Sequence, residues 1–119
     1  MKKLIIKFTC LDGDYCFTLD NGAFLVETNI AYLDNNSGVV ENYDEIISKI
    51  NELNLYTWNN EGESQAIDIE DAVKWHIQID DYVISGIEGS WPYKYDSLID
   101  ILVSLDQNIS IFKANISNK

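Results

Sequence analysis

The sequence contains no arginine, and histidine and proline occur once each, at His76 and Pro92. Without arginine the chain has no guanidinium group for bidentate binding of phosphate or carboxylate. It also lacks a glycine-rich phosphate loop and a serine in a nucleophile-elbow motif. A serine–histidine–acid triad would have to use His76. These absences count against catalysis, and we expect a protein that is not an enzyme.

Cysteine is also scarce, because only Cys10 and Cys16 are present, on either side of an Asp-Gly turn. In a hairpin they could lie opposite each other, close enough for a disulfide, although free thiols are expected in a reducing compartment. Two cysteines and one histidine are too few for a zinc site. The acid-rich stretch 12–22 lacks the spacing of a calcium-binding loop. We therefore expect no metal and no other cofactor.

Long apolar runs are missing as well. None approaches the roughly 18 to 20 residues that a membrane span needs, and the basic N-terminus is not followed by a cleavage signal. We expect a cytoplasmic protein that does not bind membranes. With 119 residues and 46% hydrophobic content, the chain is the right size for a single domain over residues 1–119.

Acidic residues are abundant: the sequence has 20 aspartates and glutamates and only 8 lysines, for a net charge of −12. Such a charge repels nucleic acid and anionic membranes and attracts basic proteins. We therefore expect a basic protein partner and no direct contact with nucleic acid. The alternative is that the acidity serves only solubility.

The first third of the chain predicts a meander of antiparallel strands. Segments 3–10, 15–20 and 23–33 are rich in alternating apolar and β-branched residues, and Asp-Gly and Asn-Gly turn signals separate them. We interpret 34–38 as a loop. A further short strand is expected at 55–58.

Two later segments have helical periodicity. The first follows Asn42, a suitable N-cap with Glu45 three residues on, and Asn54 can close it. The second begins near Asp96, after Pro92, and the alternating tail 109–116 is interpreted as a last edge strand or, alternatively, a frayed end. The apolar positions of the two helices are Tyr43, Ile46, Ile47, Ile50 and Leu53, and Tyr95, Leu98, Ile99, Leu102 and Leu105.

Residues 74–87 predict a hairpin with a two-residue turn at Asp80 and Asp81. In that register Trp75 faces Gly86 on the apolar side, and His76 lies on the more polar side, so we interpret it as a solvated strand residue. Together these elements predict an α+β fold: an antiparallel sheet of about five to six strands, with two amphipathic helices packed on one face.

The densest acidic run lies between the first helix and this hairpin, with aromatic residues before it and further along the chain. Tyrosine and tryptophan inside a charged rim are typical anchors of protein interfaces, although they also serve as the edges of cores. The alternative for the run itself is a solvated connection. The residues that we predict to bind a partner are Trp58, Glu61, Glu63, Asp68, Glu70, Asp71, Trp91 and Tyr93.

The span 43–105 resembles a loosely defined group of small intracellular bacterial proteins, some of which lie where toxin-immunity proteins would. In that group a helix precedes a tryptophan, a W-x-I-x-I strand, a glycine, a proline and a closing helix. The chain departs from the pattern with SWP before the second helix and EDAVKW before the strand, which leaves the register near residue 73 open. The matching residues are Trp58, Trp75, Ile77, Ile79 and Pro92.

The leading hypothesis is a stoichiometric inhibitor of immunity type, which binds a basic toxin, with a nuclease as the first candidate, and blocks its active site with carboxylates in place of phosphates. Electrostatic steering would speed the encounter, and buried aromatic anchors would hold the complex. One alternative is a phage anti-defence protein, anti-CRISPR-like, that mimics nucleic acid. Another is a small-ligand or assembly module.

Overall fold

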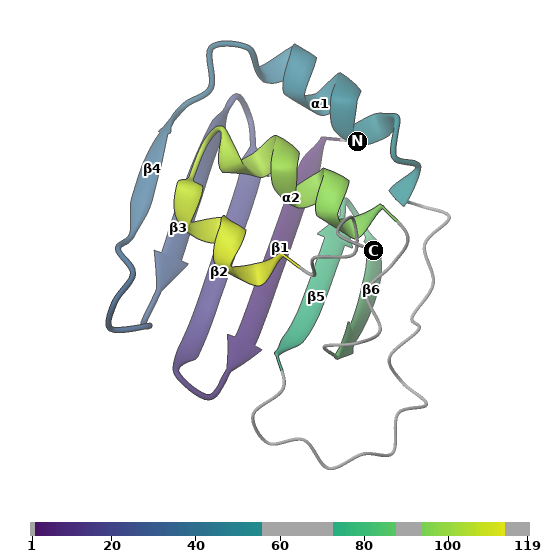
Figure 1. Cartoon of the computed structure of the whole chain (residues 1–119). Helices are drawn as coiled ribbons and strands as arrows, with labels where there is room; N and C mark the ends of the chain where they lie inside the picture. Colours follow the sequence, from purple (N-terminus) through teal and green to yellow (C-terminus); the bar gives the residue numbers. More distant parts are fainter. Residues whose placement is uncertain (1, 56–72, 88–93, 114–119) are drawn as a thin grey trace.

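The computed structural model describes residues 2–55, 73–87 and 94–113. Its central element is a six-stranded antiparallel sheet with the strand order β4-β3-β2-β1-β5-β6, shown in Figure 1. The predicted α+β class is confirmed. The strands are β1 Lys3–Cys10, β2 Gly13–Asp20, β3 Ala23–Thr28, β4 Asn36–Val39, β5 Lys74–Ile79 and β6 Tyr82–Ile87.

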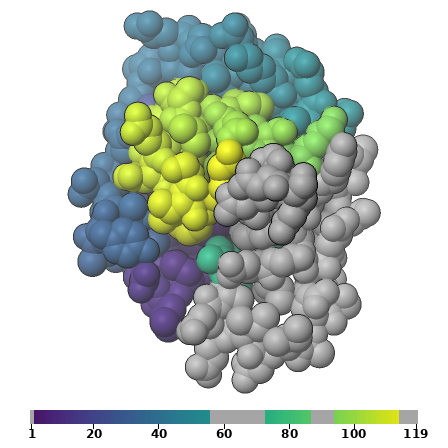
Figure 2. Space-filling model, in the orientation of Figure 1, coloured from purple at the N-terminus to yellow at the C-terminus, as the bar shows by residue number. Residues whose placement is uncertain are grey.

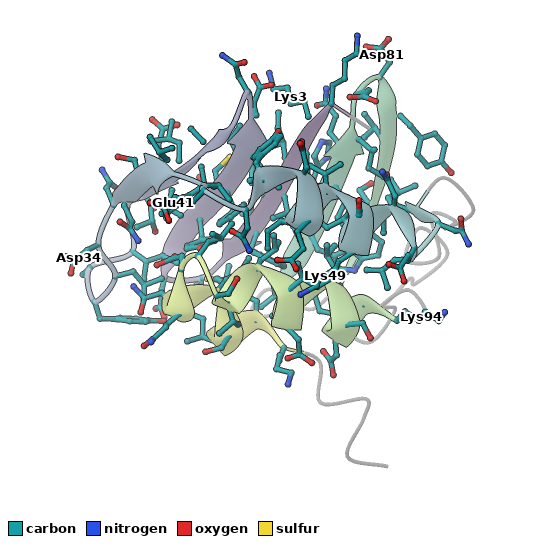
Figure 3. The ribbon with its side chains drawn as sticks, turned by 90° about the horizontal axis from the view of Figure 1, so that it is seen from above. Lys3, Asp34, Glu41, Lys49, Asp81 and Lys94 are labelled. Carbon is teal, nitrogen blue, oxygen red and sulfur yellow. The ribbon has the colours of Figure 1, made fainter. Side chains whose placement is uncertain are left out.

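Three helical segments cover one face of this sheet: α1 Tyr43–Asn51, α2 Tyr95–Val103 and the 3-10 helix η2 Gln107–Phe112. Figures 1 and 3 show all three on the same side. Both amphipathic helices bury residues of the predicted apolar stripes: Ile46 and Ile50 in α1, and Leu98, Ile99 and Leu102 in α2.

Strict alternation along the strands separates the core from the other face of the sheet. In β1, Leu4, Ile6 and Phe8 are fully buried, whereas the alternate residues Lys3 and Lys7 are exposed and Ile5 is half-buried. Because side chains alternate along each strand, the strand register places the buried residues of paired strands on the same face of the sheet. The central position of β1, paired with both β2 and β5, brings the largest buried side chains under the helices.

The hairpin at residues 74–87 has the predicted register. Trp75 pairs with Gly86, and a Cβ atom at residue 86 would lie 2.5 Å from Cζ2 of the Trp75 ring. The glycine is therefore needed because the indole occupies the space of a side chain. His76 is half-buried on the opposite face, between Lys7 of β1 and Ser85 of β6.

The segment after β2 differs from the prediction. The third strand ends at Thr28 rather than residue 33, and β4, residues 36–39, includes 36–38 of the predicted loop. The strand ends there because Asn29 turns back to the start of β2: its side chain accepts a hydrogen bond from the Asp14 N–H at 2.7 Å. The Thr28 hydroxyl donates to the Asp14 carbonyl at 2.6 Å.

The predicted edge strand at 109–116 is wrong for its described part, which is η2. Ile109 and Phe112 are both buried, and a spacing of three residues suits a 3-10 helix, in which positions i and i+3 share a face. The alternation of Ile109 with Ile111 suggested a strand with both residues on its buried face, but Ile111 is exposed. Of the strand predicted at 55–58, Leu55 lies in a 3-10 turn and the rest is outside the described residues.

Two local predictions also need correction. Cys10 and Cys16 are both free thiols. In the strand register Cys10 stands across from Gly13 and Cys16 across from Lys7, so the two cysteines are not cross-strand neighbours and lie on different faces of the sheet. The reason is the two-residue turn at 11–12, which offsets them. Asn42 precedes α1 as predicted, but its side chain makes no cap: its Nδ2 donates to Glu45 at 3.1 Å.

Candidate partner-binding surface

The eight residues predicted to bind a partner all lie outside the described residues, so that surface stays a prediction. They are Trp58, Glu61, Glu63, Asp68, Glu70, Asp71, Trp91 and Tyr93. The first described residue after the acidic run is Val73, which lines a pocket beside η2. That pocket directs attention to the surface around η2.

Aromatic packing holds η2 on the sheet. The Phe112 ring stacks on Phe8 with centroids 4.1 Å apart and an interplanar angle of 7°, and it also contacts Tyr15 at 5.3 Å. From α2, the Tyr95 hydroxyl donates to the Phe112 carbonyl at 2.8 Å. Such contacts anchor the short helix as a rigid ridge, although 3-10 helices are marginal on their own.

One side of this ridge exposes apolar side chains. Leu11, Tyr32 and Ile111 are 73%, 65% and 50% exposed, and all three line one pocket of about 410 Å³. They come from the β1–β2 turn, the loop after β3 and η2. In Figure 2 these purple, blue and yellow segments adjoin on one face of the molecule. We call this group the η2 apolar patch.

Polar contacts hold the patch in place. The Tyr32 hydroxyl donates to Asp12 at 3.0 Å, and this hydrogen bond is the main reason that the pKa of Tyr32 is raised. Beneath it, Gly13 has a φ of 136°, which brings the turn against Asn29. The exposed ring thus lies beside an exposed carboxylate, to which it is hydrogen-bonded.

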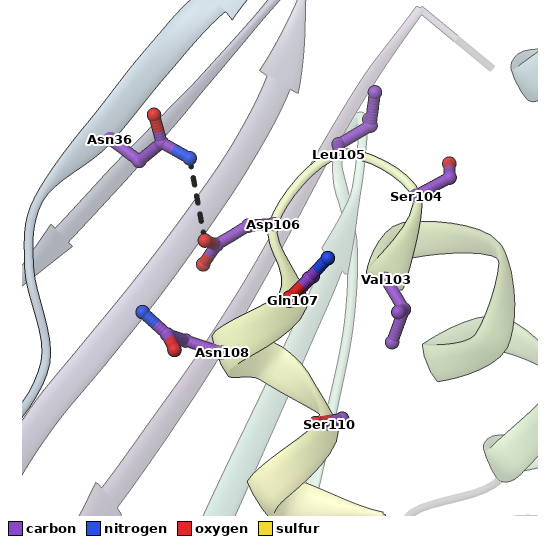
Figure 4. Close-up of a pocket in the computed structure, with 8 residues that line it drawn as sticks. All are labelled: Asn36, Val103, Ser104, Leu105, Asp106, Gln107, Asn108 and Ser110. Carbon is purple, nitrogen blue, oxygen red and sulfur yellow. Dashed lines mark hydrogen bonds between the residues drawn. The ribbon is translucent and has the colours of Figure 1, made fainter.

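The other side of η2 forms a polar pocket of about 740 Å³. Its most buried polar group is Asp106, which is 6% exposed and accepts a hydrogen bond from the Tyr15 hydroxyl at 2.5 Å. Figure 4 shows the same carboxylate turned towards Asn36, whose Nδ2 donates to it at 3.4 Å. Burial, followed by this contact with Asp106, raises the pKa of Tyr15 well above its usual range.

Among the described residues, lysines lie on both sides of the sheet. Three exposed lysines, Lys3, Lys7 and Lys74, lie on the sheet face turned away from the helices. On the helical side, Lys113 at the end of η2 is paired with Asp100 at 2.8 Å. Two further exposed lysines, Lys49 of α1 and Lys94 before α2, also lie on the helical side.

No group of three histidine, cysteine or acidic side chains among the described residues could hold a metal ion. Burial is the main reason that the pKa of the Cys16 thiol is raised, which favours the unreactive thiol over the thiolate. None of the described helices has the length and apolar character needed to cross a membrane.

The fold and this surface define a small acidic α+β protein with an exposed apolar patch and an adjacent pocket that contains the Asp106 carboxylate. Comparisons with protein-family models, curated proteins and solved structures found no match. The resemblance drawn from the sequence pattern therefore remains a hypothesis.

Sequence reasoning missed both parts of the η2 surface. Tyr32 was placed inside a predicted strand, and Asp106 follows a helix without any distinctive motif. One signal was available: Leu11 in a hairpin turn is an unusual place for a large apolar residue, since such turns favour glycine, asparagine and aspartate.

Proposed function

We propose that this protein is a non-catalytic, acidic inhibitor of immunity type, which binds a basic toxin and covers its active site. The observation that carries the proposal is the η2 apolar patch beside Asp12 in a chain of net charge −12. Exposed large apolar residues that share one pocket are typical of protein interfaces. The surrounding negative charge selects a basic partner.

Binding would proceed in two stages. The negative field of the whole molecule steers a basic protein towards it, because attraction between opposite net charges accelerates encounter. Leu11, Tyr32 and Ile111 then lose their contact with water against the partner, and this burial supplies the stability of the complex. The acidic run 61–71, which leads to Val73 at the edge of the patch, would add carboxylates that occupy the phosphate sites of a nuclease.

The test compares two matched triple variants. Leu11→Ser, Tyr32→Ser and Ile111→Ser remove the η2 apolar patch, whereas Leu25→Ser, Val39→Ser and Val83→Ser remove three other exposed apolar residues from the opposite sheet face. Each immobilised protein is used to capture partners from a lysate of the source organism. Captured proteins are identified, purified and assayed for nuclease activity with and without this chain.

We expect a basic protein that binds wild type and the sheet-face control but not the patch variant, and whose activity is lost at a one-to-one ratio. Capture of no basic protein, or equal capture by both variants, would contradict the proposal. A basic partner whose activity persists in the complex would reject inhibition and favour the assembly module. Capture of a host defence nuclease in place of a toxin would favour the nucleic-acid mimic.

A further inference from the structure

The polar pocket beside η2 has the composition of a cation-binding site. Asp106 is its carboxylate, and amides and hydroxyls make up most of the remaining lining. The residues that line it are Asn36, Val103, Ser104, Leu105, Asp106, Gln107, Asn108 and Ser110. None of these is cationic, so no side chain of the lining itself neutralises the carboxylate.

The carboxylate has acceptor capacity that its described contacts do not use. A carboxylate offers about four lone-pair positions. Tyr15 donates to Oδ2 at 2.5 Å from the core side, and Asn36 donates to Oδ1 at a long 3.4 Å. Both donors are neutral, whereas a charge-assisted bond from a cation would be shorter and about twice as strong.

Ser104 and the carboxylate itself favour a donor rather than an acceptor as ligand. The Ser104 hydroxyl gives its proton to the Ile101 carbonyl at 2.9 Å, so its oxygen is left to accept. The Asn36 carbonyl oxygen receives the Ser37 N–H at 2.9 Å, which fixes the amide with its Nδ2 towards Asp106. An anion would meet the Asp106 carboxylate and be repelled.

We propose that the Asp106 pocket binds a guanidinium group. A planar guanidinium presents five N–H donors and matches a carboxylate in a bidentate fork, whereas an ammonium is a strongly hydrated point charge. The group comes either from an arginine side chain of a bound protein or from a free small guanidine. The proposal does not rest on the inhibitor role, because it concerns only the chemistry of this pocket.

The experiment titrates the ¹⁵N-labelled protein with N-acetyl-arginine amide and follows amide chemical shifts by NMR. Neutral N-acetyl-citrulline amide and charged N-acetyl-lysine amide are the comparators. We expect saturable shifts at Asn36 and residues 104–110 with the arginine probe, and at least tenfold weaker binding of both comparators. Equal binding of the citrulline probe, or shifts spread evenly over other carboxylates, would overturn the proposal.

Two variants locate the charge. Asp106→Asn keeps an oxygen for Tyr15 but removes the negative charge, and we expect it to weaken the arginine probe at least tenfold. Asp100→Asn, a change at an exposed carboxylate of α2, should alter binding less than twofold. If Asp106→Asn does not fold, the wild-type shift map and the citrulline comparison decide the matter by themselves.

Competition identifies the source of the group. If the arginine probe displaces a captured partner, the guanidinium is the partner's side chain; if it binds without displacing the partner, the ligand is a free guanidine. A chain that captures no basic partner but still binds the probe would reject the inhibitor role and leave the pocket assignment standing.

Discussion

Trp75 and Gly86 illustrate how single residues position the core. The indole is 1% exposed and lies where a side chain at residue 86 would stand. His76, the next residue along β5, faces the other side of the sheet with Lys7 and Ser85 as neighbours. Adjacent residues of one strand thus have different roles, because side chains alternate between faces.

Trp75→Ala should lower the free energy of unfolding by about 3 to 5 kcal/mol, as expected when a buried aromatic ring is removed. His76→Ala, the matched change on the other face, should alter it by less than about 0.5 kcal/mol. Urea denaturation measures both. A histidine variant that folds normally but loses a biological activity would contradict the non-enzymatic interpretation.

Two buried tyrosines predict a pH dependence. Burial, followed by contact with Asp106 for Tyr15 and by the charge of Asp96 for Tyr95, raises both pKa values in the folded state. Unfolded tyrosine loses its proton near pH 10, so the unfolded state is increasingly favoured as the pH rises from about 10. Below that pH both states keep these protons, and these groups add no pH dependence.

We therefore expect the urea midpoint to fall above about pH 10, and Tyr15→Phe to fall less steeply over that range. The direct measurement is tyrosinate absorbance at 295 nm near pH 10.5, before and after unfolding. Native protein should show fewer ionised tyrosines than unfolded protein. Equal absorbance in the two states would show that the buried hydroxyls titrate normally.

At the scale of elements, periodicity was a good guide wherever one face of an element is buried. The hairpin β5–β6 and the start of α2 near Asp96 followed directly, because burial enforces alternation in a strand and the i, i+3, i+4 spacing in a helix. Side-chain hydrogen bonds decided one failure, the early end of β3, whereas at η2 the alternation of Ile109 with Ile111 gave the wrong period. Asn29 and Thr28 end β3 through contacts with residue 14, which a local pattern does not reveal.

The candidate surface was harder to predict for a similar reason. Leu11, Tyr32 and Ile111 are far apart in the sequence and meet only because the β1–β2 turn, the loop after β3 and η2 converge. Periodicity reports which residues are buried, so it carries little information about exposed residues that gather on one face. The charge of −12, by contrast, was available from composition alone.

Asp80 connects the start of β1 to the β5–β6 turn. Its Oδ1 accepts the N–H groups of Lys2 and Lys3, both at 2.9 Å, and its own φ is 53°, in the left-handed region. Asp80→Ala loses the acceptor and is strained there, so we expect a cost of about 1 to 3 kcal/mol. Asp80→Asn keeps both features and should be nearly neutral.

Amide hydrogen exchange at Lys2 and Lys3 separates the two causes. Asp80→Gly relieves the strain but lacks the acceptor, so exchange at these amides should still be faster than in Asp80→Asn. Equal exchange in the glycine and asparagine variants would mean that the Asp80 side chain does not hold the first strand.

At the scale of the whole molecule, the acidic charge and the exposed η2 apolar patch lead to the same proposal. A strong field without an apolar anchor would give only weak, nonspecific attraction, and a patch without the field would not select a basic partner. The five acids between residues 61 and 71 link these features in the sequence, since Val73 lines the pocket of the patch.

Replacing Glu61, Glu63, Asp68, Glu70 and Asp71 by the corresponding amides should leave the urea midpoint unchanged, because they stand outside the apolar stripes of the sequence. Capture of the basic partner should weaken through slower association, with little change in the dissociation rate. Surface-immobilised kinetics measure both rates. A variant that binds as fast as wild type would show that this run is only a solvated connection.

If the protein captures a basic partner electrostatically, the association rate must depend on salt concentration. The Debye length shrinks from about 10 Å at 0.1 M salt to about 3 Å at 1 M, so steering between exposed charges is lost over this range. Stopped-flow mixing with the purified partner should give an association rate that falls at least about tenfold. A rate that is the same at both salt concentrations would contradict the electrostatic mechanism, whatever the partner proves to be.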